Sequence, residues 1–202
     1  MKTRLTCKVY CCNALYFLRS LEDSGEKVDM FMTDPMSTYD MEFNMKWLRI
    51  CYSLLKRGRI LCSFCSPPTV EGFISQAKDT GFKLVQKFER KNKLTGKMEP
   101  CIVLSKRKSR FKPFKYRHFS LKSPKLGSFP REAMKPLGLI KSLVRHFTNE
   151  GDIVIDHFLG SGTTAIACVQ TKRNFKGCEL NEDYAVIAKK RLGFKDMFRT
   201  GL

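Results

Sequence analysis

Apolar residues along the chain fall into two alternating patterns. Short continuous apolar runs, rich in β-branched and aromatic side chains, are separated by longer stretches in which apolar residues recur every three or four positions. The first pattern is typical of buried strands and the second of amphipathic helices. The runs predict strands at 6–10, 28–33, 59–65, 82–88, 101–105, 153–156 and 175–178. The helical spacing predicts helices at 14–21, 41–55, 69–80, 136–147 and 183–192, with one more beginning after Gly162.

The order of these elements predicts an α/β fold. Strands and helices alternate through most of the chain, which is typical of a mostly parallel sheet covered by helices. The runs at 82–88 and 101–105 follow one another without a helix and predict an antiparallel hairpin. Lys56, Arg57 and Gly58 read as the end of the helix at 41–55. At 202 residues, we expect a single domain over 1–202 that carries one basic insert.

Composition favours a cytoplasmic protein with reduced cysteines. No apolar run has the length of a membrane span, and the first residues lack the apolar core of a signal peptide. Several of the nine cysteines fall in apolar segments and read as small hydrophobic residues. Cys62 and Cys65 have the spacing of zinc ligands, but they lie in a predicted strand and no second pair accompanies them. We therefore predict no metal site.

The net charge of +19 indicates a polyanionic partner. Nucleic acid is the first candidate and an anionic membrane the second, while solubilising surface charge is the plainer alternative. Nine Lys and Arg residues and no acid lie between Lys106 and Lys125, interleaved with aromatic residues. We expect an exposed loop over 106–130 that contacts nucleic acid; the alternative is a solvated, disordered loop. The candidate contact residues are Lys106, Arg107, Lys108, Arg110, Lys112, Lys115, Tyr116 and Arg117.

A glycine turn at 156–163 has the features of a ligand site. Gly160 and Gly162 separate a predicted strand from a helix N-terminus, so backbone N–H groups can approach a ligand closely. The next predicted strand ends at Glu179, and a carboxylate there can accept hydrogen bonds from both hydroxyls of a ribose. Ala165 departs from the glycine pattern of dinucleotide sites. The pattern predicts a nucleoside cofactor without an essential pyrophosphate; the alternative is a packing turn beside a solvated glutamate.

Two segments resemble a known family. Residues 156–164, Asp-His-Phe-Leu-Gly-Ser-Gly-Thr-Thr, followed by 173–181, Arg-Asn-Phe-Lys-Gly-Cys-Glu-Leu-Asn, and Tyr184 are similar to the S-adenosylmethionine site of DNA amino-methyltransferases. The resemblance is to the circularly permuted class, called beta, in which the catalytic strand precedes the cofactor loop. It extends from Cys12 onward, is densest at 135–192, and implies the Rossmann-like methyltransferase fold.

The resemblance implies S-adenosylmethionine as cofactor and S-adenosylhomocysteine as product. Phe158, Gly160 and Gly162 would shape the methionine pocket, Thr163 would begin the next helix, and Glu179 would bind the ribose. Lys135 opens a Lys-Pro segment like the one that packs over the methionine end in that family. Asn13 stands where the family commonly has an acid at the adenine end, and a neutral His157 replaces a proline. The implied cofactor residues are Asn13, Asp34, Lys135, Asp156, Phe158, Gly160, Ser161, Gly162, Thr163, Glu179 and Leu180.

The family's catalytic tetrapeptide is Asp-Pro-Pro-Tyr, and residues 34–37 read Asp-Pro-Met-Ser. The exocyclic amine of a base is a poor nucleophile because its lone pair is delocalised into the ring. A carboxylate from Asp34 and the carbonyl of Pro35 would accept its two N–H bonds and localise that lone pair. Ser37 cannot stack on a flipped base, whereas Tyr39 could swing in, and so could Tyr116 or Phe119.

An aspartate at position 34 favours adenine N6 as the target, since the cytosine N4 enzymes of the family more often carry serine there. Residues 66–134 occupy the place of the family's target-recognition region. Two alternatives remain open: a weakened or inactive pseudo-methyltransferase that binds nucleic acid, and methylation of cytosine N4 or of RNA. A homodimer or a partner subunit is expected from the resemblance alone.

Overall fold

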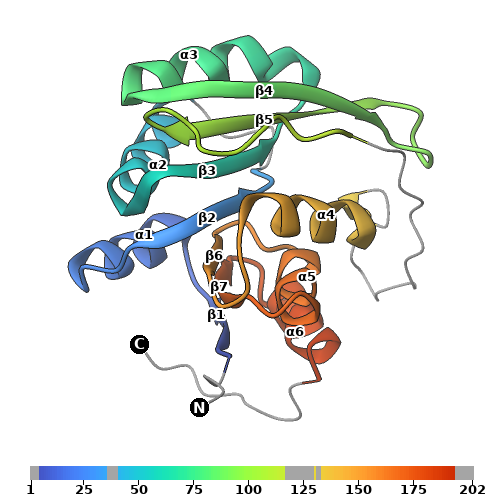
Figure 1. The fold of residues 1–202 in the computed structure, drawn as a ribbon. Coiled ribbons are helices and arrows are strands. Elements are labelled where there is room, and N and C mark those ends of the chain that lie inside the picture. The colour runs from blue at the N-terminus through green and yellow to red at the C-terminus, as the bar shows by residue number, and fades with distance from the viewer. Residues whose placement is uncertain (1–4, 36–40, 117–129, 131–132, 194–202) are drawn as a thin grey trace.

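The computed structural model describes residues 5–35, 41–116, 130 and 133–193. They form one seven-stranded sheet in the order β1-β7-β6-β2-β3-β5-β4 (Figure 1). β1, β7, β6, β2 and β3 are parallel, and β5 and β4 form the antiparallel edge hairpin. The strands are β1 Cys7–Cys11, β2 Val28–Thr33, β3 Leu55–Phe64, β4 Phe82–Lys91, β5 Met98–Lys106, β6 Ile153–Asp156 and β7 Asn174–Glu179. The predicted α/β fold with its edge hairpin is confirmed.

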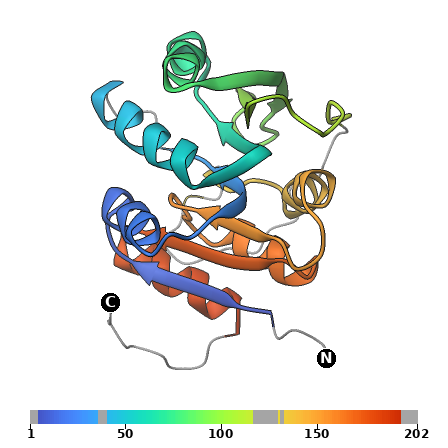
Figure 2. The same ribbon diagram turned by 60° about the vertical axis from the view of Figure 1, so that its left-hand side comes forward.

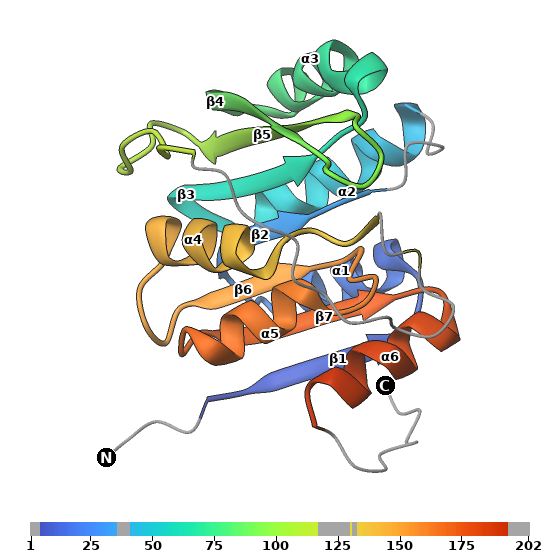
Figure 3. The ribbon, with the colours of Figure 1, turned by 90° about the vertical axis from the view of Figure 1, so that its right-hand side faces the viewer.

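In the part of the chain that the structure describes, helices cover both faces of the sheet and form three layers with it (Figures 2 and 3). On one face lie α1 Ala14–Asp23, α2 Met41–Leu54 and α3 Val70–Thr80, the last entered through a short 3-10 helix, Pro67–Thr69. On the other lie α4 Leu137–Phe147, α5 Thr163–Gln170 and α6 Glu182–Arg191. None of the helices in the described ranges is long and apolar enough to cross a membrane.

The central strand β2 explains why two cores form. All six of its residues are buried, because side chains of a strand alternate between the two helical layers. Phe31 joins the core beneath α1–α3, whereas Met30 and Met32 join the core beneath α4–α6. A strand covered on both faces reads as a mostly apolar run, and β2 follows this pattern except for Asp29 and Thr33.

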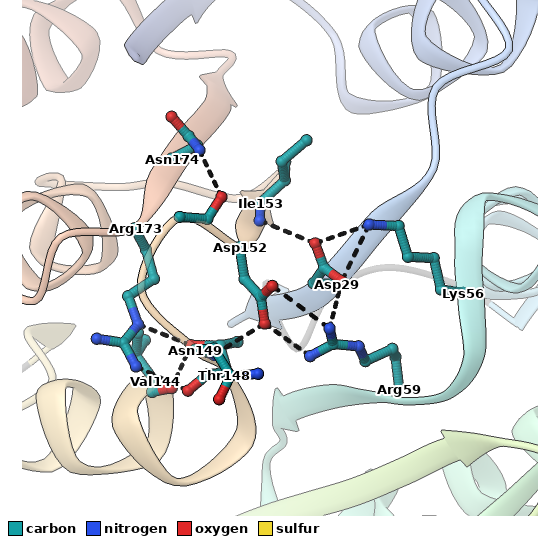
Figure 4. Close-up of polar contacts among 11 residues, drawn as sticks. Asp29, Lys56, Arg59, Val144, Thr148, Asn149, Asp152, Ile153, Arg173 and Asn174 are labelled. Atoms are coloured by element: carbon teal, nitrogen blue, oxygen red, sulfur yellow. Dashed lines mark hydrogen bonds and ion pairs between the residues drawn. The ribbon is translucent and has the colours of Figure 1, made fainter. Parts of the chain in front are cut away.

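The amino-terminal edge of the sheet is held by a network of buried charges (Figure 4). Asp29 is 2% exposed and accepts hydrogen bonds from Lys56 Nζ at 3.0 and 3.1 Å and from the backbone N–H of Ile153 at 3.1 Å. Arg59 bridges Asp29, at 2.8 Å, and Asp152, at 2.7 Å. The network joins β2, β3 and β6 at the edge opposite to the carboxyl ends of the parallel strands.

This network corrects the predicted end of the second helix. α2 ends at Leu54 and β3 begins at Leu55, so Lys56, Arg57 and Gly58 belong to the strand. Gly58 has a φ of 72°, and the pairing register of β2 with β3 shifts in this region. Lys56 is held in the sheet by its distant partner Asp29, which local sequence does not reveal.

The prediction of an exposed loop from residue 106 onward is wrong for Phe114. Its side chain is 7% exposed and packs against Phe88 and Phe147, with ring centroids 5.6 and 6.4 Å apart. The side chain of Gln86 bonds both backbone groups of Phe114, at 2.7 and 2.8 Å. Phe114 therefore joins the core because burial of its ring is favourable, while Arg107, Lys108, Arg110, Lys112 and Lys115 are exposed as predicted.

Candidate active site

A cavity of about 400 Å³ opens at the carboxyl edge of the sheet. Its wall is formed at the carboxyl ends of β1, β2, β3, β6 and β7, at the turn into α5 and the first residues of α5, and by residues before α4, with single residues of α1, α2, α4 and α6. Ligands bind at this edge of parallel sheets because strand ends and helix N-termini converge there. The lining includes most of the predicted cofactor and catalytic residues: Asn13, Asp34, Pro35, Lys135, Asp156, Phe158, Gly160, Ser161, Thr163, Glu179 and Leu180.

The Glu179 carboxylate is fixed at the end of β7 by two backbone groups. Its Oε2 accepts the N–H of Gly160 at 2.7 Å, and its Oε1 accepts the N–H of Asn181 at 2.9 Å. Gly160 has a φ of 54°, a conformation that glycine adopts without strain. Each carboxylate oxygen keeps a further lone pair, so Glu179 can still accept hydroxyl hydrogen bonds from a ligand in the cavity.

Gly162, which was predicted to shape the pocket, is not among the residues that line the cavity. It caps α5 with a φ of 84°, and a Cβ atom there would lie 2.8 Å from the Cβ of Ala188 in α6. The residue therefore serves the close approach of α5 and α6. α5 has no side-chain cap among the residues described, which leaves N–H groups at its first turn for a ligand or water.

Two of the predicted polar cofactor residues already have partners in the protein. Asn13 caps α1, and its Oδ1 accepts the N–H groups of Leu15 and Tyr16 at 2.8 and 3.4 Å. The acceptor oxygen that the sequence offered for the adenine end is thus used by the helix, and the amide N–H₂ is the group that Asn13 can offer to a ligand. Ser161 accepts Arg191 Nη1 at its Oγ and at its carbonyl, at 3.0 and 2.6 Å.

Asp156 and His157 are both buried in the wall of the cavity. Burial raises the pKa of the Asp156 carboxyl to about 7, although hydrogen bonds from Thr164 and the backbone of Phe158 oppose the shift. Burial lowers the pKa of His157 to about 3. Neither ring nitrogen of His157 has a hydrogen-bond partner among the described residues. Its ring packs against Trp47 with centroids 4.9 Å apart, so the prediction of a neutral, packed histidine agrees with its surroundings.

Asp34 and Pro35 follow β2 directly and line the cavity. The Asp34 side chain is 37% exposed, and its Oδ2 lies 2.5 Å from Lys135 Nζ. Lys135 was predicted at the methionine end of the cofactor; here its ammonium group also pairs with the predicted catalytic carboxylate. Ser37 and Tyr39, the other two predicted catalytic residues, lie outside the described residues.

Several residues of the cavity wall were not predicted from the sequence, among them Thr33, Phe43 and Thr164. Phe43 lies in α2, and its ring centroid is 6.2 Å from that of Phe158. Its helical spacing indicated a core residue, and nothing in the local pattern distinguishes a cavity wall from a core. Thr33 precedes the predicted catalytic aspartate, and that position is the one signal that could have included it.

The predicted nucleic-acid-binding residues begin at Lys106, which lies at the end of the sheet opposite to the cavity. Cys101 pairs with the end of β3 near the cavity, and β5 then runs away from it to Lys106. Lys106 Nζ donates to the carbonyl of Ser53 at 3.1 Å and lies 4.9 Å from the ring centroid of Tyr52. Burial, with the charges of Lys27 and Arg107, lowers the pKa of Lys106.

At Tyr116 the basic segment again lies near the end of the hairpin that is closest to the cavity. The ring of Tyr116 stacks on Phe88 with centroids 5.4 Å apart and an interplanar angle of 21°. The ring face toward Phe88 is therefore covered and cannot stack on a flipped base. Arg117 lies outside the described residues.

Comparison with known proteins gives a family match over part of the chain. Residues 105–190 match the sequence model of a DNA methylase family, N6_N4_Mtase. The chain is 23% identical over 237 aligned positions to the type II methyltransferase M.HpaI of Haemophilus parainfluenzae, with 92% of this chain and 74% of that protein covered. It is 26% identical to the type II methyltransferase M2.DpnII of Streptococcus pneumoniae, covering 88% of this chain and 79% of that protein.

The structure is also similar to solved structures. The complex of M1.HpyAVI with S-adenosylmethionine superposes with a TM-score of 0.76 at 26% identity, covering 93% of this chain and 99% of that one. The chain thus has the Rossmann-like α/β fold of S-adenosylmethionine-dependent methyltransferases, as predicted.

Proposed function

We propose that the protein is an S-adenosylmethionine-dependent DNA methyltransferase that modifies the exocyclic amine of a base, with adenine N6 as the target. The observation that carries the proposal is one cavity lined by Asp34 and Pro35 together with residues of the glycine turn and Glu179. The DNA methylase match over 105–190 and the type II methyltransferase relatives support the same reaction class.

The cavity suits a nucleoside cofactor. Its volume of about 400 Å³ lies within the range of small-molecule sites. Glu179 offers a carboxylate for ribose hydroxyls, and the α5 N-terminus and Gly160 offer close backbone approach. Phe158 and Leu159 give the wall an apolar part. When bound, S-adenosylmethionine supplies an electrophilic methyl group on a sulfonium centre.

The protein's own contribution to the reaction is orientation and electrostatics. Lys135 occupies Oδ2 of Asp34, so Oδ1 is the oxygen left to accept an N–H from the target amine. The carbonyl of Pro35 accepts the second N–H. Two acceptors in this arrangement pull the amine toward tetrahedral geometry and concentrate its lone pair. No covalent bond between enzyme and base is needed.

The choice of adenine rests on Asp34, and the choice of DNA rests on the relatives and on the net charge of +19. Residues 66–134, which include the β4–β5 hairpin and the basic segment, are the proposed target-recognition region. Phosphate contacts from such a segment would fix the duplex, while base contacts would select the site.

The proposal is tested by methylation of mixed-sequence duplex DNA. Purified protein is incubated with S-adenosylmethionine and DNA, the DNA is digested to nucleosides, and methylated bases are quantified by mass spectrometry. We expect N6-methyladenine, reduced about 100-fold or more by Asp34→Ala because one acceptor of the amine is removed. Asp23→Ala, which changes an exposed aspartate at the end of α1, is the matched control and should leave the yield unchanged.

Other products separate the alternatives. N4-methylcytosine would keep the mechanism and replace the target base, and product on RNA alone would replace the substrate. Cofactor binding without any product would instead indicate a nucleic-acid-binding pseudo-methyltransferase, in which residues 34–37 no longer support the reaction.

A further inference from the structure

Four side chains of alternating charge run from the edge hairpin into the cavity. Arg90 in β4 lies 2.5 Å from Glu99 Oε2 in β5. Lys135 Nζ lies 3.7 Å from the same oxygen and 2.5 Å from Asp34 Oδ2. The line Arg90–Glu99–Lys135–Asp34 thus joins two strands of the proposed recognition region to the proposed catalytic carboxylate.

Glu99 is firmly held on the hairpin side. Arg90 is opposite Glu99 in the β4–β5 register and is 4% exposed, so their charge-assisted bond lies in a poorly hydrated place. Asn92, 2% exposed, donates from Nδ2 to Glu99 Oε1 at 2.7 Å. Both oxygens of Glu99 therefore have fixed partners, and the carboxylate is a rigid point of negative charge.

Lys135 is held between two carboxylates. Its side chain is 12% exposed, and its ammonium group lies 5.0 Å from the centroid of the Phe64 ring. The contact with Asp34 is at hydrogen-bond distance, whereas Glu99 Oε2 is 1.2 Å farther away, the difference between 3.7 and 2.5 Å. An ammonium group has three donors, so Lys135 can strengthen its contact with Glu99 without leaving an unpaired charge.

The geometry points to Glu99 as a positioning residue for the methyl transfer, acting through Lys135. This role rests on the proposed function. Glu99 holds the Lys135 ammonium group beside Oδ2 of Asp34, and the Lys135–Glu99 contact strengthens when the Asp34 carboxylate turns to the target amine. Without Glu99, Lys135 has Asp34 as its one carboxylate within reach among the described residues, and it would draw that carboxylate away from the orientation in which Oδ1 meets the amine.

The test is a double-mutant cycle with Glu99→Gln, Lys135→Met and the double variant, measured for kcat, for the KM of DNA and for cofactor affinity by calorimetry. We expect Glu99→Gln to lower kcat between about tenfold and 100-fold, as for other losses of alignment, with cofactor affinity nearly unchanged. In the Lys135→Met background the same change should have little further effect, because the residue acts through Lys135. Glu150→Gln, which removes an exposed pair with Lys172 outside residues 66–134 and away from the cavity, is the control and should leave kcat unchanged.

A purely structural role for Glu99 predicts a different result. The Glu99→Gln change would then lower kcat by the same factor in both backgrounds, or would leave kcat unaltered in wild type; either result overturns the inference. Glu99→Asp, which keeps the charge and shortens the reach, should lower kcat less than Glu99→Gln and serves if the latter does not fold.

A second readout needs no activity. Urea denaturation of the same four proteins should give non-additive losses of stability if Glu99 and Lys135 interact, and additive losses would count against the inference. Absence of methylated product with the wild-type protein would instead count against the proposed function, so the two failures can be told apart.

Discussion

At the scale of single residues, Asp156 and His157 are chain neighbours that burial affects in opposite ways. The pKa of Asp156 is raised to about 7, so the folded protein binds more protons at this site than the unfolded chain between about pH 4 and 7. The contribution of Asp156 to the free energy of unfolding therefore falls as pH rises through that window. The pKa of His157 is lowered to about 3, so here the unfolded chain binds more protons between about pH 3 and 6.5. The contribution of His157 to the free energy of unfolding therefore rises with pH.

Since the two slopes oppose each other between about pH 4 and 6.5, we expect a flat stability profile in wild type. His157→Leu should unmask the slope of Asp156, and the free energy of unfolding should fall by about 1.4 kcal/mol per pH unit relative to wild type across this window. Urea denaturation without cofactor, at several pH values from about 4.5 to 7.5, measures it. Asp156→Asn should tilt the profile the other way, and parallel profiles for all three proteins would contradict the prediction.

At the scale of elements, the contact between the N-terminus of α5 and α6 depends on a missing side chain. Gly162→Ala would place a Cβ atom 2.8 Å from that of Ala188 at a φ of 84°. We expect a loss of about 2–4 kcal/mol in the free energy of unfolding, from left-handed backbone strain together with overpacking. Denaturant titration measures this loss.

Gly72→Ala is the matched control. Gly72 lies in α3, a Cβ there meets nothing within 4 Å, and alanine favours helix. This variant should equal or exceed wild type in stability. A similar outcome for the two variants would show that the α5–α6 contact can move apart without cost.

The elements themselves could be predicted because burial leaves a direct pattern in the sequence. Each strand and helix was located from apolar spacing, and the hairpin β4–β5 followed from two adjacent runs. The segment 56–58 was misassigned because Lys56 and Gly58 have local preferences typical of a helix end, while β3 is defined by its pairing with β2 and Lys56 contacts the distant Asp29. The cap formed by Asn13 was available from the sequence, since asparagine before a helix favours that position.

The motifs in the sequence predicted which residues form the candidate site, but not how those residues pair with one another. Strand ends and glycines located the cavity wall, but the pairing of Lys135 with Asp34 joins residues far apart in the chain and has no periodic signal. Glu99 lacked any sign of a link to the cavity for the same reason. The role of each site residue stays a prediction until the variants are measured.

At the scale of the whole molecule, the charge of +19 should govern how the protein meets DNA. Neutralised phosphates release counterions, so affinity falls steeply with salt. We expect the affinity for a mixed-sequence duplex to fall about 1,000-fold or more between about 50 and 200 mM salt, if about six or more phosphates are bound.

Fluorescence anisotropy with a labelled duplex measures that dependence. Replacing Arg107, Lys108 and Arg110 together by glutamine should reduce the slope of log affinity against log salt by about one for each phosphate that the variant no longer neutralises. A triple variant with the wild-type slope would place the phosphate-binding residues elsewhere on the protein.

The strand order has an evolutionary consequence. β1, β7 and β6 form one half of the sheet and carry the glycine turn and Glu179, while β5 and β4 form the far edge and carry the proposed recognition hairpin. An edge hairpin can be replaced without breaking the pairing of the other five strands. A lineage could thus exchange its sequence preference as a module and keep its cofactor pocket, provided that the incoming hairpin restores an acid where Glu99 meets Lys135.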